Sequence, residues 1–170
     1  LPYPYQASAI LLVPILFLFI IKRKIKLGVG FSFKDAGWTV VSLAVLTILI
    51  PIGTRIGFLT INPKPNYSLI PGVLLDYLLV ATVEELVFRG IVQNLLSRVT
   101  KPFPALLISS ALFAIIWTHL TGGNGVFPNW IYAGFAFGAG LVYGGSYLFS
   151  KNILVPIFIH GSVDTIRKIF

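Results

Sequence analysis

The chain has 170 residues, of which 56% are hydrophobic and only 11% are charged, and its mean hydropathy is +0.92. Soluble domains usually carry about 25% charged residues, so this composition argues against an ordinary soluble domain and indicates a membrane protein. The absence of cysteine excludes disulfides, thiolate metal ligands and a cysteine nucleophile.

The net charge of +8 is concentrated near the start of the chain. Five of the 13 basic residues follow the first apolar stretch: Lys22, Arg23, Lys24, Lys26 and Lys34. Such a loop is typical of the cytoplasmic side of a membrane protein. Anionic lipid headgroups account for this charge as well as nucleic acid would. We therefore predict the lipid bilayer as a partner and no binding of nucleic acid.

Six apolar segments are predicted to be helices, since a bilayer-spanning helix needs roughly 20 mostly apolar residues. In chain order they cover about residues 3–21, 37–59, 70–96, 103–120, 129–150 and 153–170. Loops one, three and five then hold eight Lys and Arg residues against four on the other side. This bias predicts that the first loop is cytoplasmic. The predicted fold is all-α, a polytopic transmembrane helix bundle of about six helices, forming one membrane-embedded domain over residues 1–170 of an integral, multi-pass protein.

The fifth segment carries two pairs of glycines four residues apart, Gly134 with Gly138 and Gly140 with Gly144. In lipid, van der Waals contact drives helix association, and small residues let two backbones approach closely. We predict that these glycines serve packing and let another helix press into the centre of the bundle.

The acidic residues and histidines are unusually placed. Asp35 is the acid that lies clearly in a loop. The others fall inside apolar segments together with both histidines: Asp76, Glu84, Glu85, His119, His160 and Asp164. A charge at the centre of a bilayer costs at least about 2.5–3.5 kcal/mol, so such groups persist where they pair, face a wet cavity or take part in chemistry. We predict that the two glutamates, the two histidines and Asp164 converge with Arg89 on one intramembrane polar site, and that Asp76, which has no partner at helical spacing, is structural.

Helical spacing suggests which of these groups meet. Glu85 and Arg89 are four residues apart and are predicted to form a structural ion pair. Glu84 points about 100° away from Glu85, which leaves it free for another partner. His160 and Asp164 are also four apart, and could form either part of a site or a polar clamp between helices. His119 ends the fourth segment, where it could face a cavity.

A carboxylate and an imidazole can together bind and deprotonate water, with or without a metal. A second imidazole could stabilise the oxyanion that develops when this water attacks an amide. Because the chain has neither cysteine nor a serine in a nucleophile motif, an activated water is the natural attacker. These residues indicate hydrolysis of an amide within a membrane.

Two of these motifs resemble those of a known family. The segment Glu84-Glu85-Leu-Val-Phe-Arg89 resembles the Glu-Glu-x-x-x-Arg motif of the CPBP family, the CAAX-protease and bacteriocin-processing membrane proteins, also called the type II CAAX prenyl endopeptidase or Abi family. His160-Gly-Ser-Val-Asp164 resembles its His-x-x-x-Asn/Asp motif. The family's middle motif is Phe-x-x-x-His. His119 matches it, but position 115 is Ile, and the nearest phenylalanine is Phe113.

The resemblance spans about residues 71–164, within a family core of about 68–168, and implies an all-helical intramembrane protease. By likeness, Glu84 and His119 would activate the water. His160 and Asp164 would complete the catalytic set, and Arg89 would hold Glu85. The family is often described as a metalloprotease. If a metal binds, the resemblance implies Glu84, His119 and His160 as its ligands, with zinc the default for nitrogen and oxygen donors.

The predicted function is therefore an intramembrane CAAX-type endopeptidase, a hydrolase whose substrate is a peptide or a membrane-protein tail. A second hypothesis is a non-catalytic family member that serves as an immunity factor, a regulator or a subunit of a membrane complex, with a partner in that complex. A third is a small transporter that uses the buried acids as a proton relay; the order of the motifs argues against it.

Overall fold

The computed structural model describes residues 28–29, 32–55, 67–121 and 127–169. The predicted first helix, about residues 3–21, lies outside these residues. The described elements are α2 (Phe33–Arg55), a short 3-10 helix η1 (Tyr67–Leu69), α3 (Ile70–Glu85), a π-helix η2 (Leu86–Gln93), α4 (Asn94–Val99), α5 (Pro102–Ala114), α6 (Trp117–Leu120), α7 (Trp130–Ser150) and α8 (Leu154–Ile169). The described chain contains no strand, only an isolated bridge between Gly28 and Asn152, so the all-α prediction is confirmed.

Local sequence signals set several helix ends. Pro102 opens α5, where its missing N–H costs nothing. Asn129 caps α7, because its side-chain oxygen accepts a hydrogen bond from the backbone N–H of Tyr132 at 3.0 Å. The left-handed conformation of Lys151 (φ 59°) ends α7. The side-chain oxygen of Asn152 then accepts from the backbone N–H of Leu154 at 3.0 Å, at the start of α8.

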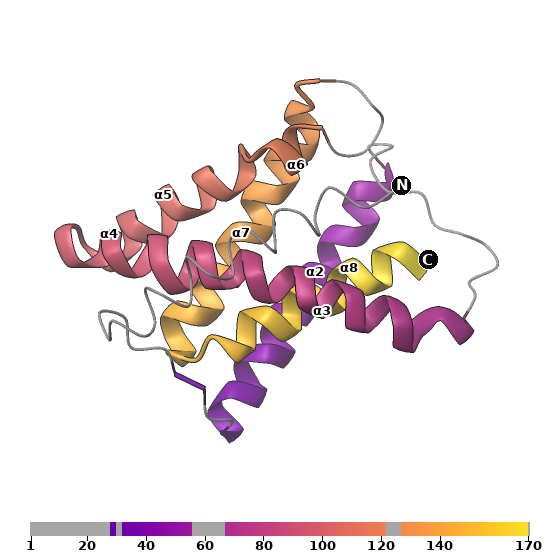
Figure 1. Cartoon of the computed structure of the whole chain (residues 1–170), viewed down its shortest axis with the longest axis horizontal. Coiled ribbons are helices and arrows are strands. Elements are labelled where there is room, and N and C mark those ends of the chain that lie inside the picture. The colour runs from indigo at the N-terminus through magenta and orange to yellow at the C-terminus, as the bar shows by residue number, and fades with distance from the viewer. Residues whose placement is uncertain (1–27, 30–31, 56–66, 122–126, 170) are drawn as a thin grey trace.

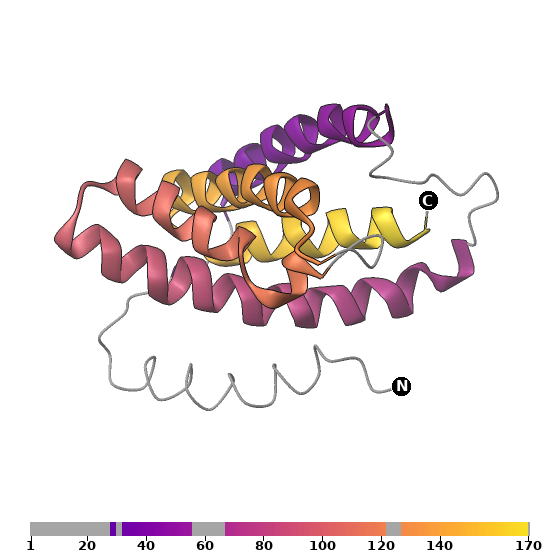
Figure 2. The same cartoon turned by 90° about the horizontal axis from the view of Figure 1, so that it is seen from above.

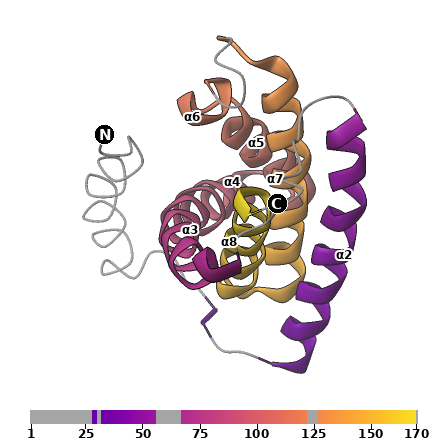
Figure 3. The ribbon, with the colours of Figure 1, turned by 90° about the vertical axis from the view of Figure 1, so that its right-hand side faces the viewer.

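Helix α8 lies in the middle of the molecule, with α3 along one side and α2 along the other (Figures 2 and 3). Helix α7 packs on α2, α5 and α8, and α5 crosses beside η2 (Figure 1). None of the described helices combines the length and the hydropathy that crossing a bilayer would require.

The start of α2 is fastened to the turn between α7 and α8. The N–H of Ile153 donates to the carbonyl of Gly28 at 2.9 Å, and the Asn152 amide donates to the Asp35 carboxylate at 3.3 Å. Asp35 is buried in the first turn of α2, which begins at Phe33 rather than near residue 37, so its predicted position in a loop is wrong. A carboxylate at this point accepts from the orphan N–H and the hydroxyl of Ser32.

The glycines of α7 divide into two groups. A Cβ added at Gly140 would lie 3.2 Å from Ser110 Cβ and 3.3 Å from the Arg89 guanidinium, and one added at Gly144 would lie 2.4 Å from Leu106 Cδ1. This pair therefore lets α5 and η2 approach α7, as predicted. For Gly134 and Gly138 the packing prediction is wrong within the described residues, because a Cβ there would meet nothing within 4 Å.

Gly161 in α8 makes a closer approach that the sequence did not indicate. A Cβ at this position would lie 3.1 Å from the Cα of Leu78 in α3 and 2.7 Å from its Cδ2. Because backbone cannot move aside as a side chain can, this glycine sets the separation of α3 and α8, the two helices that carry Glu84, Glu85 and His160.

Gly161→Ala is expected to destabilise the protein by about 1–3 kcal/mol, the usual cost of an extra methyl group in a packed interface. The matched control is Gly134→Ala. It places the same methyl group in open space in a helix interior, where alanine is favoured over glycine by up to about 1 kcal/mol. Thermal unfolding in detergent should therefore shift in opposite directions for the two variants. Equal shifts would show that α3 and α8 are not held at this distance by Gly161.

Candidate active site

The site is built on a π-helix that follows α3. Eight residues, Leu86–Gln93, wind with the wider π turn, and such segments are frequent at functional sites. Carbonyls along this segment accept hydrogen bonds from side chains. Ser109 Oγ donates to the carbonyl of Phe88 at 2.7 Å, and the Asn94 amide donates to the carbonyls of Arg89 at 3.2 Å and Gly90 at 2.9 Å. The wide turn is thus fixed by donors from α5 and from its own end.

The structure brings Glu85 and Arg89 together in the interior. Arg89 Nη1 donates to Glu85 Oε1 at 3.2 Å, Nε lies 3.1 Å from Oε2, and both side chains have no exposed area. The guanidinium also donates to the carbonyl of Gly140 at 2.9 Å and lies 4.5 Å from the ring centroid of Phe113. This charge is therefore neutralised, hydrogen-bonded and covered by an aromatic face, as a buried cation requires.

His160 is the centre of the acidic cluster. Its Nδ1 lies 2.8 Å from Glu85 Oε1, and because a carboxylate can only accept, this nitrogen carries the proton. Its Nε2 lies 3.8 Å from Glu84 Oε2 and 3.5 Å from Asp164 Oδ2. Glu84 and Glu85, adjacent in the chain, thus reach one imidazole from its two nitrogens. Glu84 thus has a partner other than Arg89, as its different direction on the helix predicted, although this partner is shared with Glu85.

Exposure separates these carboxylates into two kinds. The side chain of Glu85 is fully buried, whereas those of Glu84 and Asp164 are 16% and 22% exposed. The imidazole of His160 is buried and stacks on Tyr143, with centroids 4.6 Å apart and an interplanar angle of 17°. Glu85 and Tyr143 therefore hold the ring, and Glu84 and Asp164 are the partly exposed carboxylates of the cluster.

His119 joins the cluster through an aromatic neighbour. The fourth predicted segment is broken, because α5 ends at Ala114 and α6 begins at Trp117. His119 Nδ1 lies 2.6 Å from the carbonyl of Phe113, to which it donates, and the two rings are 4.4 Å apart. The Phe113 ring is also 5.7 Å from that of His160. Among the described side chains, His119 makes no hydrogen bond or ion pair with Glu84, His160 or Asp164.

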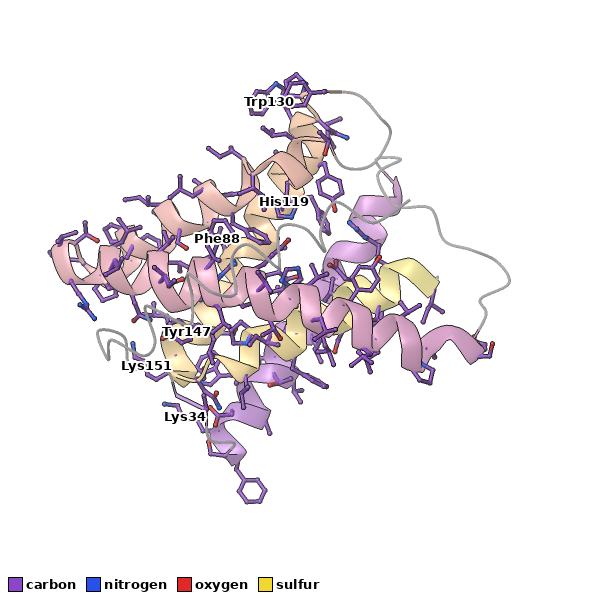
Figure 4. The ribbon with its side chains drawn as sticks, viewed as in Figure 1. Lys34, Phe88, His119, Trp130, Tyr147 and Lys151 are labelled. Carbon is purple, nitrogen blue, oxygen red and sulfur yellow. The ribbon has the colours of Figure 1, made fainter. Side chains whose placement is uncertain are left out.

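The helix break explains the irregular middle motif. Phe113 is 1% exposed and touches both histidines, whereas Ile115, at the position of the family's phenylalanine, is 52% exposed. The side chains that link the site and that sequence reasoning missed are Phe113 and Tyr143; a signal for Phe113 was its place as the nearest phenylalanine to His119. In Figure 4, His119 and Phe88 lie on one side of α3 and η2, and Lys34 and Lys151 lie together on the other.

The predicted zinc ligands are Glu84, His119 and His160. Within the described chain, no three His, Asp or Glu side chains are placed to hold a metal ion. His160 Nδ1 and His119 Nδ1 are already engaged by Glu85 and the Phe113 carbonyl, so only their Nε2 atoms could serve as donors. The arrangement does not fit a three-ligand site, and zinc remains a prediction from the sequence.

The chain matches the model of one known family. A model of the family described as type II CAAX prenyl endopeptidase Rce1-like matches residues 66–166, which is more than half of the chain and includes Glu84, Glu85, Arg89, His119, His160 and Asp164. Searches of curated proteins and of solved structures found no match. The family is a membrane-embedded protease family. The resemblance noted in the sequence is thereby confirmed, and the chain belongs to the Rce1-like family of type II CAAX prenyl endopeptidases.

Proposed function

We propose that this protein is an integral, multi-pass membrane endopeptidase that hydrolyses a peptide bond with a water activated by Glu84 and His119. The observation that carries the proposal is that the two adjacent glutamates differ in their contacts and exposure. Both carboxylate oxygens of Glu85 contact Arg89 or His160, while Glu84 is partly exposed and lies 3.8 Å from His160 Nε2. A glutamate held beside an imidazole on the open side of a buried cluster suits a general base.

Glu84 would accept a proton from the attacking water, whose oxygen then bonds to the carbonyl carbon of the substrate. His119 can assist as an acceptor. Its Nδ1 donates to the Phe113 carbonyl, so in the neutral ring Nε2 is the free lone pair that can bind the same water. The proton held by Glu84 would pass to the leaving nitrogen when the C–N bond breaks, which returns Glu84 to the carboxylate.

His160 would stabilise the oxyanion that forms on the substrate carbonyl. Two carboxylate oxygens face its Nε2, and since carboxylates only accept, both contacts favour an N–H at this nitrogen. A substrate oxygen that becomes negative could take the same N–H. The bond from Nδ1 to Glu85 and the stack on Tyr143 keep the ring oriented, so little reorganisation is needed as charge develops.

Insertion of the chain in a bilayer belongs to the same proposal. It is supported by the membership of a membrane-embedded family and by large apolar side chains that are exposed on α2, α3, α5 and α7, among them Ile48, Leu79, Leu112 and Phe149. In this environment the peptide or membrane-protein substrate would reach a site away from bulk water, where each electrostatic contact is stronger than in water.

The proposal is tested with purified protein in detergent and a set of short peptides. Glu84→Gln is expected to lower the cleavage rate by at least about a hundredfold, the usual contribution of a general base, while the unfolding temperature stays unchanged. His119→Ala should also reduce cleavage. Asp35→Asn is the matched control, since it makes the same carboxylate-to-amide change in the first turn of α2, where Asp35 contacts Asn152 and not the site, and it should retain activity. Full cleavage by both Glu84→Gln and His119→Ala would refute the proposal and favour a non-catalytic role in a membrane complex.

A further inference from the structure

A polar stripe on α8 runs outward from the site. His160, Asp164 and Arg167 are separated by four and three residues, so they lie on one face of the helix. His160 is buried, the Asp164 side chain is 22% exposed, and Arg167 is exposed. The stripe therefore leads from the proposed reaction centre to a surface that a substrate can reach, and it ends in a cation.

Arg167 is held beside the site by Tyr132 at the start of α7. Its Nη1 donates to the Tyr132 hydroxyl, and its Cζ lies 5.4 Å from the centroid of the Tyr132 ring. The ring of His119 also lies beside that ring, at 5.8 Å between centroids and an interplanar angle of 29°. One aromatic side chain thus separates the Arg167 guanidinium from the imidazole that is proposed to bind the water.

Arg167 and Arg89 differ in how their charges are satisfied. Arg89 is fully buried and paired with Glu85. Among the described residues, Arg167 forms no ion pair with a carboxylate, and Asp164, the acid on the same face of α8, pairs with His160 at 3.5 Å. Its single hydrogen bond within the described chain uses Nη1, which leaves the edge formed by Nε and Nη2 for another acceptor. That edge presents two parallel N–H donors, the geometry that a carboxylate accepts.

We propose that Arg167 binds a carboxylate of the peptide substrate and thereby positions the chain across Glu84 and His119. This inference rests on the proposed endopeptidase function and adds a specificity-determining residue to it. The carboxylate is either the C-terminus of the peptide or the side chain of an Asp or Glu near the bond that is cut. An extended chain rises about 3.3 Å per residue, so ring contacts of 5.8 Å and 5.4 Å place the carboxylate only a few residues from that bond.

The experiment compares three peptides that differ only in charge: one with a free C-terminal carboxylate, its C-terminal amide, and one with an acidic side chain near the cut replaced by its amide. Wild-type protein is expected to prefer one carboxylate form by about ten- to hundredfold in kcat/KM, which is the value of a charge-assisted hydrogen bond. The carboxylate whose replacement by an amide lowers kcat/KM is the one that Arg167 binds. The difference should lie in KM, because Arg167 contacts no reacting atom.

Arg167→Gln should reduce the ratio of kcat/KM between the carboxylate peptide and its amide to about one. The amide peptide should be cleaved as fast as by the wild-type protein. Arg98→Gln is the matched control, an exposed arginine in α4 at the other end of the molecule (Figure 1), and should keep the full preference. Tyr132→Phe removes the hydroxyl that holds the guanidinium and should weaken the preference in part. If Arg167→Gln keeps the preference, or slows all three peptides equally as a structural or lipid-binding role would, the inference is overturned.

Measurements of peptide binding test the role of Arg167 independently of the proposed cleavage. The dissociation constants of fluorescent acid and amide peptides are measured with Glu84→Gln protein, which is expected to bind without cleaving. A preference for the acid that disappears in Glu84→Gln/Arg167→Gln supports the role of Arg167 even where no variant cleaves. Equal binding of acid and amide overturns it even where cleavage depends on Glu84.

Discussion

Arg89→Met is expected to destabilise the protein by about 3–5 kcal/mol, the cost of leaving one charge of a buried ion pair without its partner. The variant removes both contacts to Glu85 and the hydrogen bond to the carbonyl of Gly140, while Glu85 stays fully buried. It also removes the cation that covers the face of Phe113. Thermal or denaturant unfolding in detergent measures the loss, and Arg98→Met in α4 is the matched control at an exposed arginine.

The double variant Arg89→Met/Glu85→Leu distinguishes stability from activity. Apolar replacement of both members of a buried pair is often neutral, so much of the stability should return. Cleavage should not return, because His160 Nδ1 then loses the carboxylate at 2.8 Å that orients its ring. An unfolding temperature as low as that of Arg89→Met, or full activity in the double variant, would contradict this account of Glu85.

The sequence was informative wherever two groups share one helix. The Glu85–Arg89 spacing predicted their ion pair, and the His160–Asp164 spacing placed these groups on one face, where their atoms lie 3.5 Å apart. The apolar segments predicted four helical stretches of the structure: α2, α7, α8, and the continuous stretch made of α3, η2 and α4. The ends of these stretches differ from the predicted ones by a few residues. These predictions need only the period of the helix and the cost of an unpaired charge in an apolar segment.

Contacts between helices could not be predicted in this way, because they depend on the distance and rotation of two packed elements. The bond of Glu85 to His160 crosses from α3 to α8 at a separation that Gly161 permits. The π turns of Leu86–Gln93 change the direction of every side chain after Glu85, and a period of 3.6 residues does not anticipate them. The break after Ala114 is likewise invisible in a continuous apolar run, yet it brings His119 back against Phe113.

Phe113 is where these unpredicted contacts meet, and Phe113→Ala is expected to destabilise the protein by about 3–5 kcal/mol, as for other buried phenylalanines. Its ring lies 4.4 Å from His119, 5.7 Å from His160 and 4.5 Å from the Arg89 guanidinium, so its loss removes the common neighbour of all three. Phe113→Leu keeps most of the apolar volume and should cost less than about 1.5 kcal/mol. It should nevertheless reduce cleavage, because both imidazoles lose the aromatic contact that positions them.

Ile115 provides the matched control, because the family motif places its phenylalanine at position 115 whereas the structure gives that role to Phe113. Ile115 is 52% exposed, so Ile115→Ala should change stability and cleavage little. Adding a phenylalanine by Ile115→Phe should not rescue Phe113→Ala, since position 115 lies in the turn after α5 and outside the contacts to His119 and Arg89. Rescue by Ile115→Phe would mean that α5 and α6 form one continuous helix with the regular motif, and that His119 faces the site from another direction.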